Sequence, residues 1–419
     1  MCRKWRNVVF GSPRRLGLEL LCKARTPVRE TSDIWPPLPI IIWTAFNEKW
    51  GDDNIIAALE HNDRICSITV SFVPSSQWEN VLEALHQPFP SLDFLQLACK
   101  DETLPVLPDS FLGGSAPNLE RLVLDHIPFP GLPKLLLSAT HLVHLHLYRI
   151  PHSGYISPEV MVTCLSVLTR LKSFLIGFES PQSRPDRRRP PPQTRTLLPI
   201  LDSLRFQGVS EYLEDLVARI DVPLLNDLNI TFLHQLIFEI PQLNQFISRT
   251  PKFIAFDKAY VQFGNRLVSV ALPPKSVSEL GLVFEIICDQ SDWQLSSLAQ
   301  LCSFSFPQAL IPAVERLYII DEVRSQLRWQ GDIESDQWLE LLQPFTGVKE
   351  FYISRGFAPR ITPALQELAE EWVTEASLPA LKTIFLQGEH LSGSAIEHFI
   401  AARQLAGHPI AVSRWEKID

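Results

Sequence analysis

The chain has 419 residues, which is too long for one conventional compact core, so either several bodies or a stack of repeats is expected. Its hydrophobic fraction of 46% and charged fraction of 20% are typical of a folded chain and exclude a disordered one. The formal net charge of −9 argues against a general nucleic-acid-binding protein, which needs a basic face to neutralise phosphates.

The N-terminal region precedes any repeat. Met1 is followed by charged residues without an apolar h-region, so we expect no secretory signal. The alternation Leu16-x-Leu18-x-Leu20 is strand-like. An apolar run follows near residues 40–46, far short of the ~20 residues that cross a bilayer, so no membrane span is expected.

From residue 65 onward one phrase recurs: apolar, two variable residues, apolar, one variable residue, apolar. Its twelve copies start at Ile65, Leu92, Leu119, Leu142, Leu171, Leu201, Leu225, Pro251, Val277, Val314, Val348 and Leu381. The starts are spaced by roughly 23 to 37 residues, the spacing of stacked repeats. The last two apolar positions lie two residues apart, so they point to one face of a strand. The copy at Pro251 is degraded.

Helical patterns lie between the phrases. After the first phrase, Ser76 and Glu79 form a capping-box pattern ahead of an apolar stripe. A second stripe runs through Leu213, Leu216, Val217 and Ile220 with helical spacing. Near the end, Thr362 fits an N-cap and Pro363 the first helical position, followed by a stripe of Leu365, Leu368 and Trp372.

Strand, loop, helix and loop in constant register predict an α/β solenoid: a leucine-rich-repeat horseshoe with parallel strands on its concave face and helices on its convex face. Such a stack offers a long binding surface. The stretch from Ser180 to Arg195, rich in proline and arginine, predicts an exposed extended loop between two repeats. It is either a solvated connector or a docking motif for a proline-reading or acidic partner.

The strand positions that alternate with the apolar ones are expected to project from the concave face. Arginine, tyrosine and histidine on a rigid platform suit protein recognition. The candidates for this protein-binding face are Arg121, Asp125, His144, His146, Tyr148, Arg205, Asn229, Tyr318 and Tyr352.

No motif of a known catalytic class is present: the chain lacks G-x-S-x-G, H-E-x-x-H, G-x-G-x-x-G and a P-loop. His144 and His146 face one side and could bind a metal together with Asp125, but no further ligand is evident, so we expect no metal, no cofactor and no catalysis. The seven cysteines are single, with no C-x-x-C pair, and indicate small buried thiols in a reducing compartment.

The segment from Cys2 to Pro13 resembles the last helix and exit of an F-box. Over nearly its whole length the chain is similar to a family of basidiomycete F-box/leucine-rich-repeat-like proteins. The matching stretches are Thr26–Arg29, Pro108–Pro117, Pro128–Thr140, Ile150–Pro158 and His408–Trp415.

The resemblance implies a domain order: a C-terminal F-box remnant over residues 1–15, a leucine-rich-repeat-like solenoid of about 12–14 repeats over 16–404, and a C-terminal cap or tail over 405–419. Family members look like substrate-recognition subunits of Skp-cullin-F-box ubiquitin ligases, in which the F-box binds a Skp-type adaptor. The corresponding adaptor-binding remnant is Cys2, Trp5, Val8 and Pro13.

A full F-box is a three-helix unit, so this F-box is expected to be truncated, or to continue upstream of Met1. The leading hypothesis is a monomeric, non-catalytic substrate receptor in the cytoplasm or nucleus that holds a target protein. It would contact a Skp-type adaptor if a full F-box exists upstream, and it would bind neither nucleic acid nor membrane. The alternative is a free-standing leucine-rich-repeat scaffold that has lost adaptor binding. An enzyme would require a convergent nucleophile or metal set.

Overall fold

A computed structural model describes residues 18–22, 28–30, 38–44, 52–71, 75–99, 106–181, 194–254, 256–274, 281–288, 291–304, 306–307, 310–321, 335–370, 378–387, 394–405 and 407–416. The chain divides into two compact units. Unit 1 comprises Met1–Gln182, Pro192–Leu204 and Arg219–Pro223, and unit 2 comprises Ser183–Pro191, Arg205–Ala218 and Leu224–Asp419. Cys2, Trp5, Val8, Pro13 and most of the proline- and arginine-rich stretch lie outside the described residues.

Unit 1 contains seven parallel strands that follow one another in the order of the sequence. They are β1 (Leu18–Leu21), β2 (Ile40–Trp43), β3 (Ile65–Ser71), β4 (Phe94–Ala98), β5 (Arg121–Asp125), β6 (His144–Ile150) and β7 (Ser173–Phe178). The connections carry α3 (Asp52–Leu59), α4 (Ser75–Ala84), η2 (Phe111–Gly114), α5 (Leu132–Ser138), η3 (His152–Gly154) and α6 (Pro158–Leu165). A separate parallel pair is formed by β8 (Thr196–Leu197) and β10 (Ile220–Asp221).

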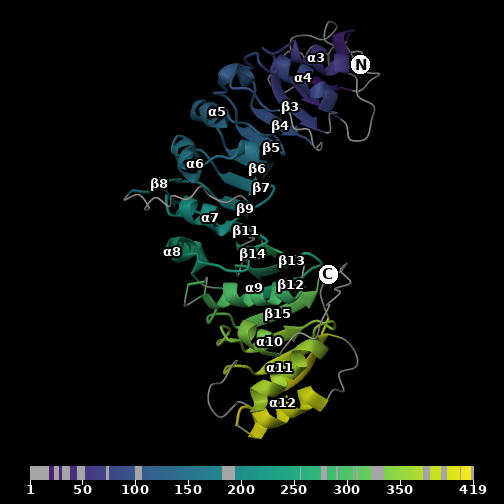
Figure 1. Cartoon of the computed structure of the whole chain (residues 1–419), viewed down its shortest axis with the longest axis vertical. Helices are drawn as coiled ribbons and strands as arrows, with labels where there is room; N and C mark the ends of the chain where they lie inside the picture. Colours follow the sequence, from purple (N-terminus) through teal and green to yellow (C-terminus); the bar gives the residue numbers. More distant parts are fainter. Residues whose placement is uncertain are drawn as a thin grey trace, which may run out of the picture. The chain divides into compact units, whose positions relative to one another are not determined.

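The core of unit 1 is built from the apolar residues of the recurring phrase. Leu95, Leu122, Leu145 and Phe174 are paired in register across four strands, and all four are fully buried. Each repeat therefore stacks the same apolar position on its neighbours. In Figure 1, helices α5 and α6 line one side of strands β5 to β7, and the other side of these strands carries no helix. We call the side without helices the open face.

Unit 2 continues the parallel pattern with one interruption. Its strands are the larger part of β9 (Ser203–Gly208), β11 (Asp227–Leu233), β12 (Lys258–Phe263), β13 (Leu267–Leu272), β14 (Gly281–Ile287), β15 (Arg316–Asp321), β16 (Glu350–Ile353), β17 (Thr383–Gln387) and β18 (Ala411–Trp415). Its helices are α7 (Ser210–Val217), α8 (Pro241–Arg249), η4 (Pro251–Phe253), α9 (Ser291–Phe304), α10 (Ser335–Leu342), α11 (Ala358–Glu370) and α12 (Ser394–Leu405).

The interruption is an antiparallel hairpin. The strands lie in the spatial order β11, β14, β13, β12, β15. After β11 the chain forms β12 three positions away in the sheet, then turns back through the antiparallel strand β13. It then forms β14, which pairs in parallel with β11. The twelvefold phrase did not predict this arrangement. The phrase at Pro251 is wrong as a strand: Pro251 begins the short helix η4, and Ile254 is 65% exposed. A proline lacks the amide that a ladder needs, and the strand forms instead over the alternating residues 258–263.

Three local predictions are wrong in their boundaries. Helix α7 ends at Val217, and buried Ile220 belongs to strand β10. Helix α11 begins at Ala358, so Thr362 lies inside it, where its hydroxyl donates to the carbonyl of Ala358 and does not cap the helix. Helix α4 begins at Ser75, which places Ser76 within its first turn. The spacing of apolar residues predicts which face of a helix is buried, but it does not fix the residues at which the helix begins and ends.

The region 405–419, predicted as a cap or tail, contains the strand β18, which pairs in parallel with β17. With that addition and the hairpin, the repeated strand–helix–strand topology is the predicted α/β solenoid of the leucine-rich-repeat class. Among the described residues, no helix is both long enough and apolar enough to cross a membrane.

Candidate functional site

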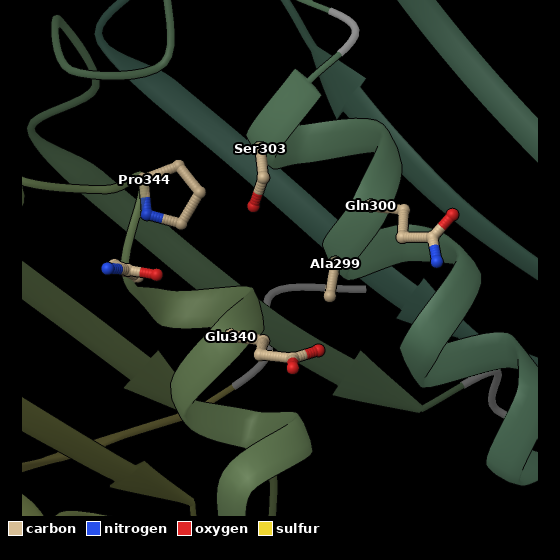
Figure 2. A pocket seen from close by; sticks show the side chains of 6 residues that line it. Ala299, Gln300, Ser303, Glu340 and Pro344 are labelled. Carbon is tan, nitrogen blue, oxygen red and sulfur yellow. The ribbon is translucent and has the colours of Figure 1, made fainter. Parts of the chain in front are cut away.

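The helix side of unit 2 carries an open hollow of about 500 Å³ between α9 and α10 (Figure 2). It is lined by Ala299, Gln300, Ser303, Glu340, Gln343 and Pro344. Figure 2 shows the labelled polar side chains spread around its rim and not converging on one point. A single carboxylate with amides and a hydroxyl offers no nucleophile and base pair, so this hollow is not a candidate for chemistry.

The open face of unit 1 presents the predicted side chains on β5 and β6. Arg121, Asp125, His144, His146 and Tyr148 are all partly or well exposed, whereas the leucines between them are buried. The register places Arg121 beside His144, Val123 beside His146, and Asp125 beside Tyr148. Alternation in the sequence therefore assigned the two faces of these strands correctly.

Aromatic and basic groups contact one another on this face. The guanidinium of Arg121 lies 5.7 Å from the ring centroid of Phe94 on β4, and the His144 and His146 rings meet edge to face at 6.1 Å. The His146 ring continues to Tyr148 at 6.0 Å, and its Nε2 lies 2.9 Å from the hydroxyl of Ser173. These contacts make an ordered platform with exposed polar tips.

The electrostatics of His144 follow from its neighbours. Partial burial lowers its pKa below the ordinary value of 6.5, and the positive charges of Arg121 and Lys172 lower it further, against a smaller opposite effect of Glu120. His144 is therefore held neutral at physiological pH and presents a hydrogen-bonding ring.

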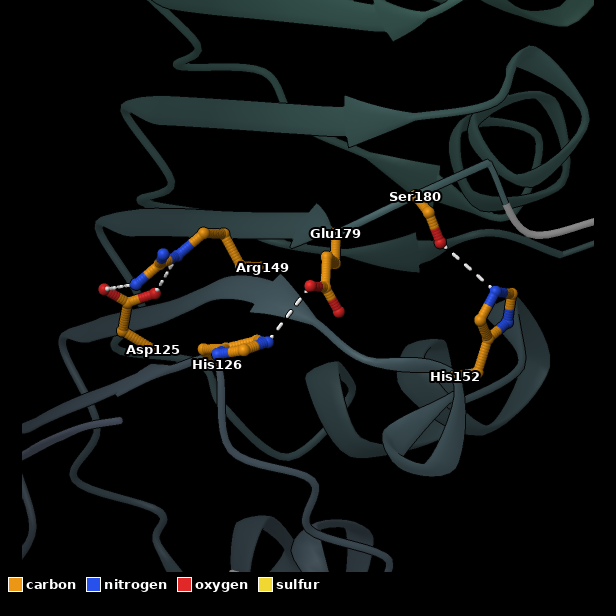
Figure 3. Close-up of polar contacts among 6 residues, drawn as sticks. All are labelled: Asp125, His126, Arg149, His152, Glu179 and Ser180. Atoms are coloured by element: carbon orange, nitrogen blue, oxygen red, sulfur yellow. Dashed lines mark hydrogen bonds and ion pairs between the residues drawn. The ribbon is translucent and has the colours of Figure 1, made fainter. Parts of the chain in front are cut away.

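A polar cluster lies where β5, β6 and β7 end (Figure 3). Arg149 donates from Nε and Nη2 to the two oxygens of Asp125, at 2.7 and 2.9 Å. His126 Nε2 lies 3.1 Å from a carboxylate oxygen of Glu179. The pairing of β6 with β7 shifts its register between Leu147 and Ile150, and within this bulge Arg149 has φ of 47°. The bulge brings Arg149 to the side of Asp125.

Of the three side chains considered for a metal, Asp125 and His146 have other partners. Both Asp125 oxygens are engaged by Arg149, and His146 contacts Ser173. Within the part of the chain that the structure describes, no three or more histidine, cysteine or acidic side chains are grouped so that they could hold a metal ion.

The next predicted residues, on β9 and β11, make polar pairs with their neighbours. Arg205 approaches the carboxylate of Asp227 at 3.4 Å, and Thr231 donates its hydroxyl to Glu285 at 2.7 Å. Asp227 is only 8% exposed and Thr231 9%, whereas the Arg205 side chain is 46% exposed. Asn229 stays partly exposed between them. Arg205 and Asn229 therefore remain accessible, while Asp227 and Thr231 are buried beside them.

In unit 2 we use the name open face for the side of the strands on which the alternate, partly exposed residues lie, and an aromatic ladder dominates it. Tyr260, Tyr318, Tyr352 and Phe385 are paired in register on β12, β15, β16 and β17. Their rings stack with centroid separations of 4.5, 4.2 and 4.3 Å and interplanar angles of 11°, 13° and 4°. The ring spacing is close to the spacing of strands, about 4.8 Å, so one side chain per strand builds a continuous column.

The ladder is flanked by a tryptophan and a carboxylate. The Trp415 ring meets Tyr352 at 5.7 Å and 88°, and its indole nitrogen donates to the carbonyl of Ile353 at 3.2 Å. Tyr352 donates its hydroxyl to Glu350 at 2.9 Å. Burial and this bond to a carboxylate raise the pKa of Tyr352 far above its ordinary value. The Tyr352 hydroxyl therefore stays protonated at neutral pH.

Sequence reasoning nominated Tyr318 and Tyr352 but missed Tyr260 and Trp415. Tyr260 lies on the hairpin strand that the recurring phrase does not include, although the period-two pattern of Ala259, Val261 and Phe263 around it could have revealed the strand. Trp415 lies in the region predicted as a tail, and nothing local to it predicts a contact 62 residues away in the chain.

Comparisons of the chain with protein-family models and with curated proteins give no match. Among solved structures, the chain is similar to the leucine-rich repeat-containing protein LegL7 of Legionella pneumophila, with 12% identity and a TM-score of 0.31. The alignment covers 94% of this chain and 98% of that one. So distant a likeness adds nothing to the repeat class that the strand topology already shows.

Proposed function

We propose that this protein is a non-catalytic interaction solenoid that holds a target protein on its open face. The observation that supports this most is the pair of ordered, partly exposed platforms: Arg121 with the two histidines in unit 1, and the tyrosine ladder in unit 2. Aromatic side chains lose little conformational entropy on binding, and aromatic residues and arginine are enriched where proteins recognise one another.

The more specific form of the proposal is a substrate receptor of a Skp-cullin-F-box ubiquitin ligase. It rests on the resemblance of Cys2 to Pro13 to the end of an F-box. Purified chain is mixed with a purified Skp-type adaptor, and binding is measured by calorimetry, with Trp5→Ala as the variant expected to lose it. A folded chain that does not bind the adaptor would contradict the ligase role and favour a free-standing scaffold.

The proposal that the open face binds a protein is tested by placing a crosslinker at two different positions. A photo-crosslinking amino acid replaces Val123 on the open face or, as the matched control, exposed Gln245 on helix α8. We expect saturable crosslinking to a partner from Val123 only, competed by excess unlabelled chain. Equal crosslinking from both positions, or none from Val123, would contradict recognition by the open face.

A further inference from the structure

The tyrosine ladder stops at Tyr260, although the sheet continues beyond it. The strand that pairs with β12 on the other side is β13, and its residue aligned with Tyr260 is Ala271. Ala271 in turn is aligned with Val283 on β14. All three side chains are partly exposed on the open face. The column of rings is thus followed by a methyl group, and then by a branched aliphatic side chain.

By register and strand spacing, the small side chain of Ala271 leaves room for one planar group between Tyr260 and Val283. Strands lie about 4.8 Å apart, so β12 and β14, with β13 between them, are about 10 Å apart. A flat group above Ala271 would lie about 3.5–4 Å from the free face of the Tyr260 ring and contact Val283 on its other side. We call the space bounded by Tyr260, Ala271 and Val283 the stacking slot.

One end of the slot is lined by hydrogen-bond acceptors. Gln262, Ser269 and Glu285 are aligned in the next register row on the same face. One oxygen of Glu285 accepts the hydroxyl of Thr231, which orients the carboxylate without neutralising it. No basic side chain of the described residues is paired with Glu285. Within the part of the chain that the structure describes, a carboxylate without a cation therefore lies on the strand next to Ala271, one row from the side of the Tyr260 ring that no other ring stacks on.

The opposite end of the slot is different. Lys258 lies two residues before Tyr260 on β12 and is in register with Arg316, which pairs with Asp257. The positive charge of Lys258 at that end means that a cationic ligand has to approach from the side of Glu285. The slot is therefore polarised, with its negative end away from the charged pair of Arg316.

We propose that the stacking slot binds an arginine side chain of the partner protein, a proposal that rests on the protein-interaction role given above. The planar guanidinium stacks on the free face of Tyr260 and donates to Glu285, with Gln262 and Ser269 within the same row. Guanidinium is the cation that suits this site, because it is flat, weakly hydrated and forked, whereas the lysine ammonium is compact and strongly hydrated.

The test uses the full chain labelled with 3-fluorotyrosine and small amides as probes. The fluorine signal of Tyr260 is assigned with Tyr260→Phe, and it is followed as N-acetyl-arginine methylamide is added. We expect a saturable shift of this signal. The citrulline amide, which has the same shape without the charge, should bind at least tenfold more weakly, and the lysine amide several-fold more weakly.

Two variants and one matched control test whether the shift of the Tyr260 fluorine signal reports binding in the stacking slot. Glu285→Gln keeps an acceptor for Thr231 but removes the charge, and should weaken arginine binding about tenfold. Ala271→Leu fills the slot from the exposed face and should abolish binding. Ser413→Leu is the control, because Ser413 is aligned with Phe385 at the other end of the ladder. Two residues further along these strands lie Gln387 and Trp415, and neither is a carboxylate. It should leave binding unchanged.

Several outcomes would overturn the inference: citrulline binding as well as arginine, Ala271→Leu leaving the shift intact, or N-acetyl-tyrosine methylamide binding more tightly than arginine. These results are separable from failure of the general role. If the crosslink from Val123 persists while the arginine probe does not bind, only the slot assignment is wrong. If the arginine probe binds while that crosslink is absent, the proposed interaction role is wrong.

Discussion

At the scale of single residues, the strands of this protein end in strained backbone. His126 follows β5 with φ of 58°, and His234 follows β11 with φ of 49°. Each donates its amide to the neighbouring strand, to Tyr148 and Ile287 respectively, at 3.0 Å. The left-handed backbone conformation is disfavoured for any residue with a Cβ. The backbone hydrogen bond to the neighbouring strand therefore holds each histidine in it.

His234 permits a direct test, because its side chain is exposed and forms no hydrogen bond or ion pair with the other described residues. We expect His234→Gly to be more stable than His234→Ala by about 1 kcal/mol, since only glycine adopts this φ without cost. Urea unfolding measures the difference. At exposed Gln245 inside helix α8 the order should reverse by about 1 kcal/mol. Equal stability of both His234 variants would contradict backbone strain at this position.

His144 gives a prediction for pH. Its pKa is lowered in the folded chain by burial and then by Arg121 and Lys172, so the unfolded chain binds more protons below the ordinary value of 6.5. The contribution of His144 to stability is therefore complete above pH 6.5 and is lost as the pH falls through the folded pKa. Arg121→Gln should raise this pKa in an NMR titration of the histidine ring, while Lys134→Gln on α5 should not. An unchanged pKa in Arg121→Gln would contradict the assigned cause.

At the scale of elements, the hairpin β12–β13 is the feature that reorganises unit 2. It separates β14 from β15, so that α9 has to connect strands that are not adjacent. It also supplies Tyr260 to the ladder and Ala271 beside it. Gly281, the first residue of β14, lies very close to β13: its φ is 77°, and a Cβ there would lie 2.5 Å from the carbonyl oxygen of Leu272.

Gly281→Ala should therefore destabilise the chain through two causes. The left-handed φ costs about 1 kcal/mol, and the collision with backbone adds about 1–3 kcal/mol. Gly407 is the matched control: its φ is 81°, but nothing lies within 4 Å of its Cβ position, so Gly407→Ala should show only the first cost. Thermal and urea unfolding of both variants measure the loss of stability, and equal losses would contradict the close approach of Gly281 to Leu272.

At the scale of the molecule, each repeat buries its apolar face on its neighbours, so stability is a sum of local terms. The described cysteines are free and report on both units. Buried Cys164 lies in unit 1, where burial raises its pKa to about 11, and buried Cys302 lies in unit 2, where burial raises its pKa further. Both thiols react only when their surroundings open.

A core substitution in one unit should therefore expose thiols of that unit first. Leu317→Ala on β15 removes a fully buried side chain of unit 2 and should cost about 2–5 kcal/mol. We expect it to accelerate alkylation of Cys302 at least tenfold with little effect on Cys164, as measured by mass spectrometry. Leu145→Ala on β6 should do the reverse. Equal acceleration at both thiols would show that the chain opens as one cooperative body.

The sequence alone determined the repeat class and the two faces of most strands. Burial of Leu122 and Leu145, and exposure of Arg121 and His144 between them, follow from a period of two that each strand carries in itself. Local patterns of this kind need no knowledge of distant partners, and for that reason they could be read in advance.

Tertiary structure decided what depends on which strands are neighbours. The stack of Tyr260, Tyr318 and Tyr352 exists because the antiparallel hairpin brings β12 beside β15 in matching register, and the chain segments involved lie tens of residues apart. The open slot beside Tyr260 arises for the same reason, since Ala271 is its neighbour only through the hairpin. Pairing between distant segments depends on the packing of the whole unit, which no single stretch of sequence encodes.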